Sequence, residues 1–124
     1  MSSLESAFTP LEGAVLSAIG EMHPEDQAQL EAQLSTATFR SRENTGGGFF
    51  THFAVDRDST PAIGGRRLRD GPAARVAGLE HGMGFILWLE GGYADCLEGY
   101  SYGNESTTGI ELERVRFELV QALG

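Results

Sequence analysis

The chain has 124 residues, of which 40% are hydrophobic and 22% are charged, and this composition predicts a single globular domain over residues 1–124. Eighteen acidic residues against nine arginines give a net charge of −9, which argues against nucleic acid and anionic membrane as partners. A single cysteine excludes an intrachain disulfide, no apolar run could span a bilayer, and the first residues lack the pattern of a signal peptide. We therefore expect a cytoplasmic protein.

The first third of the chain has the pattern of two helices over about residues 9–34. Thr9, Pro10 and Glu12 form the start of a helix with a capping box. Apolar residues follow at helical spacing: Leu11, Val15, Ile19 and Met22. A second helix is expected from Pro24, whose first turn carries two acids.

The hydrophobic period then changes to two, which predicts strands. Two alternating runs, 37–43 and 49–55, indicate a hairpin with a five-residue, glycine-rich tip. In that register Phe39 lies opposite Phe53 on one face. The other face then carries Arg40, Arg42 and His52.

The segment 56–75 combines proline, glycine and charge with little periodicity, and it predicts a long mobile loop. This loop contains five of the nine arginines and no more than a short strand at 67–69. A short strand at 76–79 is expected to follow.

The strongest pattern is a second hairpin, in which runs 85–90 and 93–98 flank a Gly-Gly turn. Pairing Glu90 with Tyr93 predicts that Glu98 lies on the apolar, core-facing side. That side is expected to carry Phe85, Leu87, Leu89, Ala94 and Cys96. The opposite side is partly apolar too, which is typical of a central strand.

The C-terminal segment 111–122 fits two structures. Val115, Phe117 and Leu119 alternate as in a strand, whereas Leu112, Val115 and Leu119 also suit a helix, and we favour the strand. Taken together, the patterns predict an α+β fold with two N-terminal helices packed on a mostly antiparallel sheet of four to six strands. The sheet is expected over about residues 36–120.

Two glycine-rich segments, 45–51 (TGGGFFT) and 97–103 (LEGYSYG), together with 84–90 (GFILWLE), resemble a family of small bacterial proteins. Its members carry similar Thr-Gly-x-Gly-Phe-Phe and Leu-Glu-Gly-x-x-Tyr-Gly segments. The resemblance covers about the central half of the chain. Because the family has no assigned activity, the resemblance implies a one-domain α+β fold and assigns no functional residue.

Phosphate and metal sites are not indicated. The glycine run 46–48 has neither a following lysine nor a strand-to-helix context, so it is typical of a hairpin tip. The three histidines, His23, His52 and His81, lack metal-ligand spacing. We therefore assign no cofactor, no metal and no catalytic residue.

Carboxylates and aromatic rings gather on the second hairpin and its continuation. The predicted register points Glu98 to the apolar face, where desolvation favours the protonated form that suits a general acid or base. Glu90 and Asp95 are expected to face outward beside Trp88 and Tyr93. The candidate binding residues are Trp88, Glu90, Tyr93, Asp95, Glu98, Tyr100 and Tyr102.

Aromatic rings beside carboxylates suit a cationic ligand or an arginine-bearing protein surface. We therefore expect a non-enzymatic interaction or regulatory module that docks a basic protein, or a small cationic ligand, through an acidic-aromatic surface. By analogy, masking of a basic toxin would fit this size and charge. The alternative is a small-molecule-binding protein or enzyme that uses Glu98 with Tyr100 and Tyr102. An enzyme should enclose Glu98 in a pocket, whereas a docking module should present a flat patch.

Overall fold

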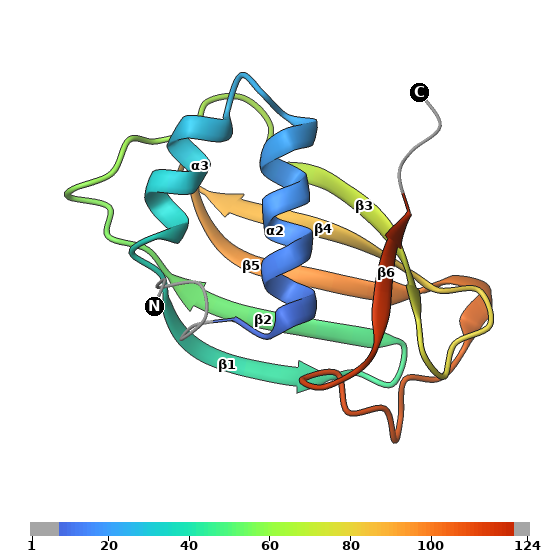
Figure 1. The fold of residues 1–124 in the computed structure, drawn as a ribbon. Helices are drawn as coiled ribbons and strands as arrows, with labels where there is room; N and C mark the ends of the chain where they lie inside the picture. Colours follow the sequence, from blue (N-terminus) through green and yellow to red (C-terminus); the bar gives the residue numbers. More distant parts are fainter. Residues whose placement is uncertain (1–7, 121–124) are drawn as a thin grey trace.

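In the computed structural model, which describes residues 8–120, two α-helices pack on one face of a six-stranded antiparallel sheet (Figure 1). The helices are α2, Pro10–Met22, and α3, Gln27–Leu34. The strands are β1, Thr38–Asn44; β2, Gly48–Ala54; β3, Leu68–Val76; β4, Met83–Glu90; β5, Tyr93–Ser101; and β6, Phe117–Val120. A short 3-10 helix, Tyr102–Asn104, follows β5. The predicted α+β class, with N-terminal helices on an antiparallel sheet, is confirmed.

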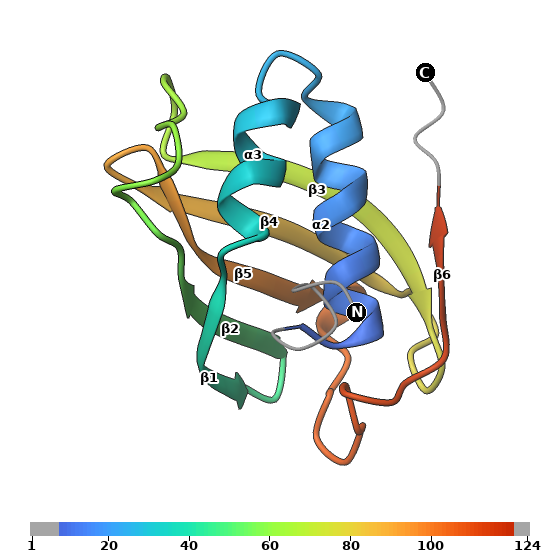
Figure 2. The same ribbon diagram turned by 60° about the vertical axis from the view of Figure 1, so that its left-hand side comes forward.

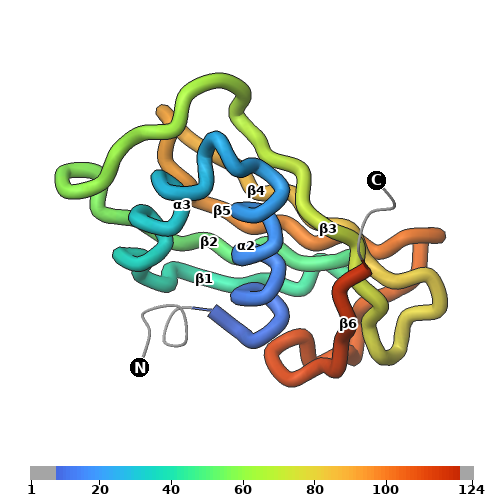
Figure 3. The backbone as a smooth tube through the Cα atoms, turned by 45° about the horizontal axis from the view of Figure 1, so that its top comes forward, coloured from blue at the N-terminus to red at the C-terminus, as the bar shows by residue number. Residues whose placement is uncertain are grey.

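The strand order across the sheet is β1-β2-β5-β4-β3-β6, so the β4–β5 hairpin occupies the centre. Both helices lie over the same side of this sheet (Figure 2). The edge strand β6 pairs with the C-terminal half of β3 and lies beside α2 (Figure 3). Over residues 8–120, no helix covers the opposite side of the sheet.

Helix α2 begins as its sequence predicts. The Thr9 hydroxyl accepts a hydrogen bond from the Glu12 amide at 3.1 Å, and the Glu12 carboxylate accepts one from the Thr9 amide at 3.0 Å. The apolar stripe of this helix is buried against the sheet and consists of Leu11, Val15, Leu16 and Ile19. The start of α2 and most of its buried face therefore follow from local pattern, but Met22, expected in the apolar stripe, is 43% exposed.

Glu12 is also the main polar link between the helices and the sheet. Its side chain is only 2% exposed, and its two oxygens accept hydrogen bonds from Arg42 of β1 at 2.7 Å each. The Thr51 hydroxyl of β2 donates to the same carboxylate. A buried carboxylate costs little only when its hydrogen bonds and its charge are both satisfied, as they are here.

Arg42 is expected to share a face with Arg40 and His52, and for Arg42 this is wrong. The hairpin tip has four residues instead of five, because Asn44 pairs with Phe49. A β-bulge at Arg40 then restores the predicted pairing of Phe39 with Phe53. The bulge turns Arg42 toward the helices and leaves His52 on the other face.

The central hairpin shows a similar correction. Its Gly-Gly turn and the pairing of Glu90 with Tyr93 are confirmed, and both turn glycines have positive φ. A bulge at Asp95 then shifts the register by one residue, so that Glu98 lies opposite Ile86. The core side consequently carries Phe85, Leu87, Leu89, Ala94 and Leu97, while Cys96 and Glu98 lie on the side without helices.

The two glycine-rich segments at 45–51 and 97–103 lie next to each other in the sheet. Phe49 pairs with Gly99, and its ring occupies the space that a Cβ on Gly99 would need. Gly48 lies against the Gly99 carbonyl and has a φ of 151°, so a side chain there would clash with the backbone. Close packing of β2 on β5 therefore explains why both segments need glycine.

The expected loop over 56–75 is shorter than predicted, because β3 already begins at Leu68. A bulge at Gly71 and Pro72 interrupts the alternation of β3 and hides the strand in the sequence. The strand expected at 76–79 is wrong as well, since Val76 ends β3 and a turn follows. The strand favoured for the C-terminal segment 111–122 is confirmed only over Phe117–Val120, since residues 111–116 form turns and irregular structure and 121–122 lie outside the described residues.

A buried glutamine holds the central hairpin against α3. The Gln33 side chain is fully buried, and its amide nitrogen donates to the carbonyls of Pro61 at 2.7 Å and Gly92 at 3.0 Å. Its amide oxygen accepts from the Ala94 backbone at 2.9 Å. The turn between β4 and β5 is therefore fixed in position by a satisfied polar contact.

Core packing of the central hairpin can be tested at Leu87, which is fully buried opposite Leu97. Leu87→Ala should lower the free energy of unfolding by about 2–5 kcal/mol, because it leaves a cavity. Arg67→Ala, at an exposed position before β3, should change it by about 0.5 kcal/mol or less. Denaturant melts of both variants measure this, and equal losses would contradict the assigned core.

The buried carboxylate gives a second prediction. Glu12→Ala should destabilise the fold by about 3–5 kcal/mol, because Arg42 and Thr51 lose their acceptor inside the protein. Glu21→Ala, on the exposed side of the same helix, is the matched control and should cost about 0.5 kcal/mol or less. If urea titrations gave the two variants similar midpoints, the carboxylate would not be a structural link.

Candidate functional site

The side of the sheet away from α2 and α3 carries large apolar and aromatic side chains. These side chains alternate along each strand with the buried ones of the core side. We call this side the open face and define it by Phe50, His52, Leu68, Asp70, Ile86, Trp88, Cys96, Glu98 and Tyr100. The apolar and aromatic members of this face are half-buried or buried by their neighbours, while His52 and Asp70 are exposed.

Glu98 occupies the middle of the open face. It lies between Phe50 of β2 and Ile86 of β4 in one row across the sheet. The Trp88 indole nitrogen donates a hydrogen bond to Glu98 Oε1 at 3.0 Å. Residues 8–120 form four ion pairs, and Glu98 takes part in none of them. The centre of this face is thus a half-buried carboxylate framed by apolar groups, without a cation of its own.

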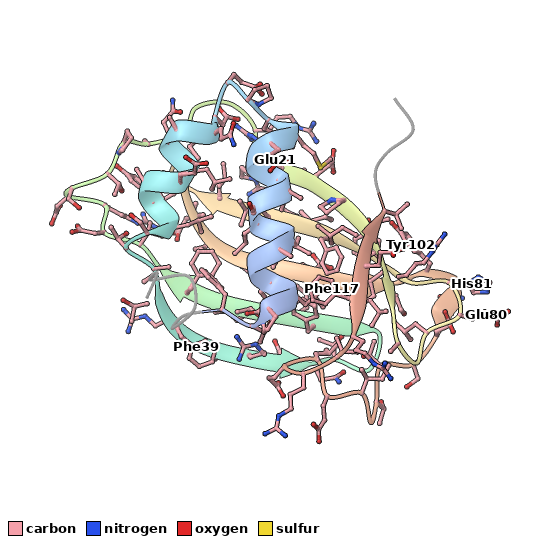
Figure 4. All side chains as sticks on the ribbon, in the orientation of Figure 1. Glu21, Phe39, Glu80, His81, Tyr102 and Phe117 are labelled. Atoms are coloured by element: carbon pink, nitrogen blue, oxygen red, sulfur yellow. The ribbon has the colours of Figure 1, made fainter. Side chains whose placement is uncertain are left out.

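Tyr100 and Tyr102 extend the aromatic surface along β5. The two rings meet edge to face, with their centroids 5.7 Å apart. The hydroxyl ends of both rings lie over Gly84, where a side chain would collide with them. Burial raises the pKa of the Tyr100 hydroxyl, and the neighbouring Tyr102 and the carboxylates of Asp70 and Glu98 raise it further. Tyr102 lies at the same end of the sheet as His81 (Figure 4).

The Cys96 thiol is subject to the same negative field. Burial, followed by the charges of Asp95, Glu98 and Glu43, raises its pKa to about 12. The thiol is therefore protonated at neutral pH, and the side chain is 7% exposed. Cys96 behaves as a small apolar residue of the open face, and it is unsuited to act as a nucleophile.

Glu90 and Tyr93 form a separate group at the hairpin turn, because Arg57 covers them. The Arg57 guanidinium lies 3.3 Å from the Glu90 carboxylate and 5.0 Å from the centroid of the Tyr93 ring. The seven predicted binding residues are thus divided. Trp88, Glu98 and Tyr100 belong to the open face. Glu90 and Tyr93 lie at the hairpin turn, where Arg57 already supplies a cation.

Asp95 sits at the bulge between these two groups and is half-buried. Burial raises the pKa of its carboxyl, and the nearby charge of Glu90 adds to the increase. Arg57 and His52 act in the opposite direction. The bulge therefore holds a carboxyl whose charged form is disfavoured in the folded protein.

The register shift also removes the reason for expecting Glu98 to act as a buried acid. That expectation required the carboxyl to point into the core, and the bulge at Asp95 places it on the open face instead. Sequence reasoning did not find Phe50, Ile86 and Leu68 as site residues. The available signal was the apolar character of 85–90 on both of its sides, which already indicated a strand with a second apolar surface.

Three cavities can be described, and one of them is also lined by Leu68 and Asp70 at the edge of the open face. A cavity of about 390 Å³ is lined by Arg42, Asn44 and residues 109–113, and one of about 320 Å³ lies around Arg66 and Arg69. The third, of about 570 Å³, lies between α2, β3 and β6. None of these three is lined by Glu98, Tyr100 or Tyr102.

Compared with known proteins, the chain matches no family model, no curated protein and no solved structure. The resemblance of the two glycine-rich segments to a bacterial family therefore stays a prediction. Within residues 8–120, no helix has the length and apolar character needed to cross a membrane. In that same part of the chain, histidine, cysteine and acidic side chains nowhere come together in threes as a metal ion requires.

The carboxyl at the bulge gives a pH-dependent prediction. Because the folded-state pKa of Asp95 is raised, this group stabilises the fold most at pH values below its ordinary pKa of 3.8, and that contribution is lost as the pH rises through the raised value. The side-chain amide in Asp95→Asn does not titrate, so this variant keeps the stabilising contribution of a neutral side chain at every pH. Relative to the native protein, the variant should therefore gain stability between acidic and neutral pH, as denaturant melts at both pH values would measure.

Glu105 is the control, because its pKa is shifted in the opposite direction. Its carboxylate accepts hydrogen bonds from the amides of His81 and Glu80, at 2.7 Å each, and these bonds lower its pKa. Its contribution is present above its ordinary pKa of 4.5 and is lost as the pH falls through the lowered value. Glu105→Gln should thus lose stability relative to the native protein at neutral pH. If both variants shifted in the same direction, the assignment of the two environments would be wrong.

Proposed function

We propose that the protein is a non-enzymatic interaction module that docks a basic protein partner through its open face. One observation carries the proposal: Glu98, which forms no ion pair within residues 8–120, lies at the centre of an aromatic and apolar sheet side that no helix of those residues covers. Apolar surface of this kind supplies binding energy when it is covered, and a central carboxylate selects a partner of positive charge.

The charges around Glu98 support a basic partner over a neutral one. Glu43, Asp70 and Asp95 lie on or beside the open face, with His52 as the basic member of the defined set. Arg75, farther along β3 on the same side, already pairs with Glu118. The net charge of −9 gives the whole chain a negative field. Such a field steers a positively charged partner toward the protein and repels acidic ones.

The position of the face in the fold supports docking over catalysis. Four hydrogen-bonded strands hold these side chains, and the central hairpin is fixed by Gln33. A rigid, preformed surface binds a partner with little loss of conformational entropy. A small cationic ligand held by Glu98 with Tyr100 and Tyr102 is the alternative, but the three described cavities are lined by other residues.

A random peptide library displayed on phage tests the proposal without a known partner. Peptides selected on the native protein should be enriched in basic residues, and their affinity should fall as salt rises, since exposed charges are screened. The double variant Asp95→Asn/Glu98→Gln should bind the selected peptides about two- to tenfold more weakly.

The matched control is Glu21→Gln/Glu25→Gln, which removes the same charge at two exposed positions. Glu21 lies on α2 (Figure 4), and Glu25 lies between α2 and α3. This control variant should leave the affinity near that of the native protein. Peptides without basic enrichment, equal losses in both double variants, or affinity that does not respond to salt would each contradict docking at the open face.

A further inference from the structure

We infer that the group received at the centre of the open face is an arginine side chain of the partner, which pairs with Glu98 and stacks on Trp88. The inference rests on the proposed function and specifies the chemistry of the partner. Three observations support it: the Glu98 carboxylate has an oxygen that is free within residues 8–120, the Trp88 ring lies beside it, and two other sites in the chain hold an arginine between a carboxylate and an aromatic ring.

The Glu98 carboxylate is oriented and has room for another donor. Its Oε1 is held by the Trp88 indole nitrogen at 3.0 Å. Among residues 8–120, Oε2 accepts no hydrogen bond, and the side chain is only half-buried, so a donor can reach it from the solvent side. A carboxylate with one oxygen anchored and the other available is a ready acceptor for a charged donor.

The ring beside this carboxylate favours a flat cation. A guanidinium group is planar, is weakly hydrated, and can stack on an indole while its N–H groups reach a carboxylate. A lysine ammonium is compact and strongly hydrated, so it loses more by leaving water for an apolar frame. Ile86 and Phe50 on either side of Glu98 provide that apolar frame.

The same chain already contains two complete examples of this arrangement. Arg42 pairs with Glu12 at 2.7 Å and lies 4.7 Å from the centroid of the Phe39 ring. Arg57 pairs with Glu90 and stacks on Tyr93. In both, a carboxylate and an aromatic ring hold one arginine between them.

Trp88 and Glu98 provide the same carboxylate and ring in direct contact, but no arginine of residues 8–120 pairs with this glutamate. The place that an arginine occupies in the other two sites is therefore available here to an arginine from another molecule. Indole binds cations better than the rings of Phe39 and Tyr93, so this site is the most favourable of the three for stacking.

Trp88 is the only tryptophan of the chain, so its fluorescence reports directly on this site. Two peptides of equal length, spacing and charge serve as probes, one built with arginine and the other with lysine. The arginine peptide should change the Trp88 emission at saturation and bind about two- to fivefold more tightly than the lysine peptide.

Glu98→Gln keeps an acceptor for the indole but removes the charge. It should weaken the arginine peptide by about fivefold and abolish most of the preference over lysine. Glu21→Gln, with the same change in net charge on the helical side, should leave both affinities and the preference unaltered.

The outcomes separate the inference from the proposal on which it rests. If both peptides bind the native protein equally well and Glu98→Gln weakens them equally, the open face docks basic partners but has no arginine site. If neither peptide binds or alters the emission, the proposed docking function fails as well. Preference for arginine that persists in Glu98→Gln would place the arginine site elsewhere.

Discussion

The fold depends on one buried carboxylate, Glu12, which joins the first helix to the two strands at one side of the sheet. Its oxygens satisfy the first turn of α2, the guanidinium of Arg42 and the hydroxyl of Thr51 at once. Because a charge this deeply buried must keep all these partners, α2 can pack only on the side that Arg42 faces. That choice determines which side of the sheet is covered and which side stays open.

The open face is carried by strands that a buried polar contact also holds in place. A second buried polar contact, from Gln33 to the turn of the central hairpin, anchors that turn to α3. Central strands must be apolar on the covered side, and these two are also largely apolar on the other. The result is a rigid aromatic surface with Glu98 at its centre, and this combination supports the docking of a basic partner.

Bulges explain most of the differences between the expected and the observed site. The single extra residue at Asp95 moves Glu98 from the core side to the open face, because side chains alternate with a period of two. The bulge at Arg40 has the reverse effect on Arg42, which lies on the side of the helices. Neither Asp95 nor Arg40 is a residue type that predicts a bulge. A hairpin register counted from the turn is therefore correct only up to the first bulge.

Local sequence by itself determined the features whose partners lie within a few residues. These are the capping box at Thr9 and Glu12, the Gly-Gly turn, and the alternation that distinguishes strands from helices. Tertiary structure alone decided that Arg57 pairs with Glu90, from 33 residues away, and that Glu98 forms no ion pair within residues 8–120. The physical reason is that charge pairing and bulge position depend on which distant strands and loops meet, and no local pattern records such contacts.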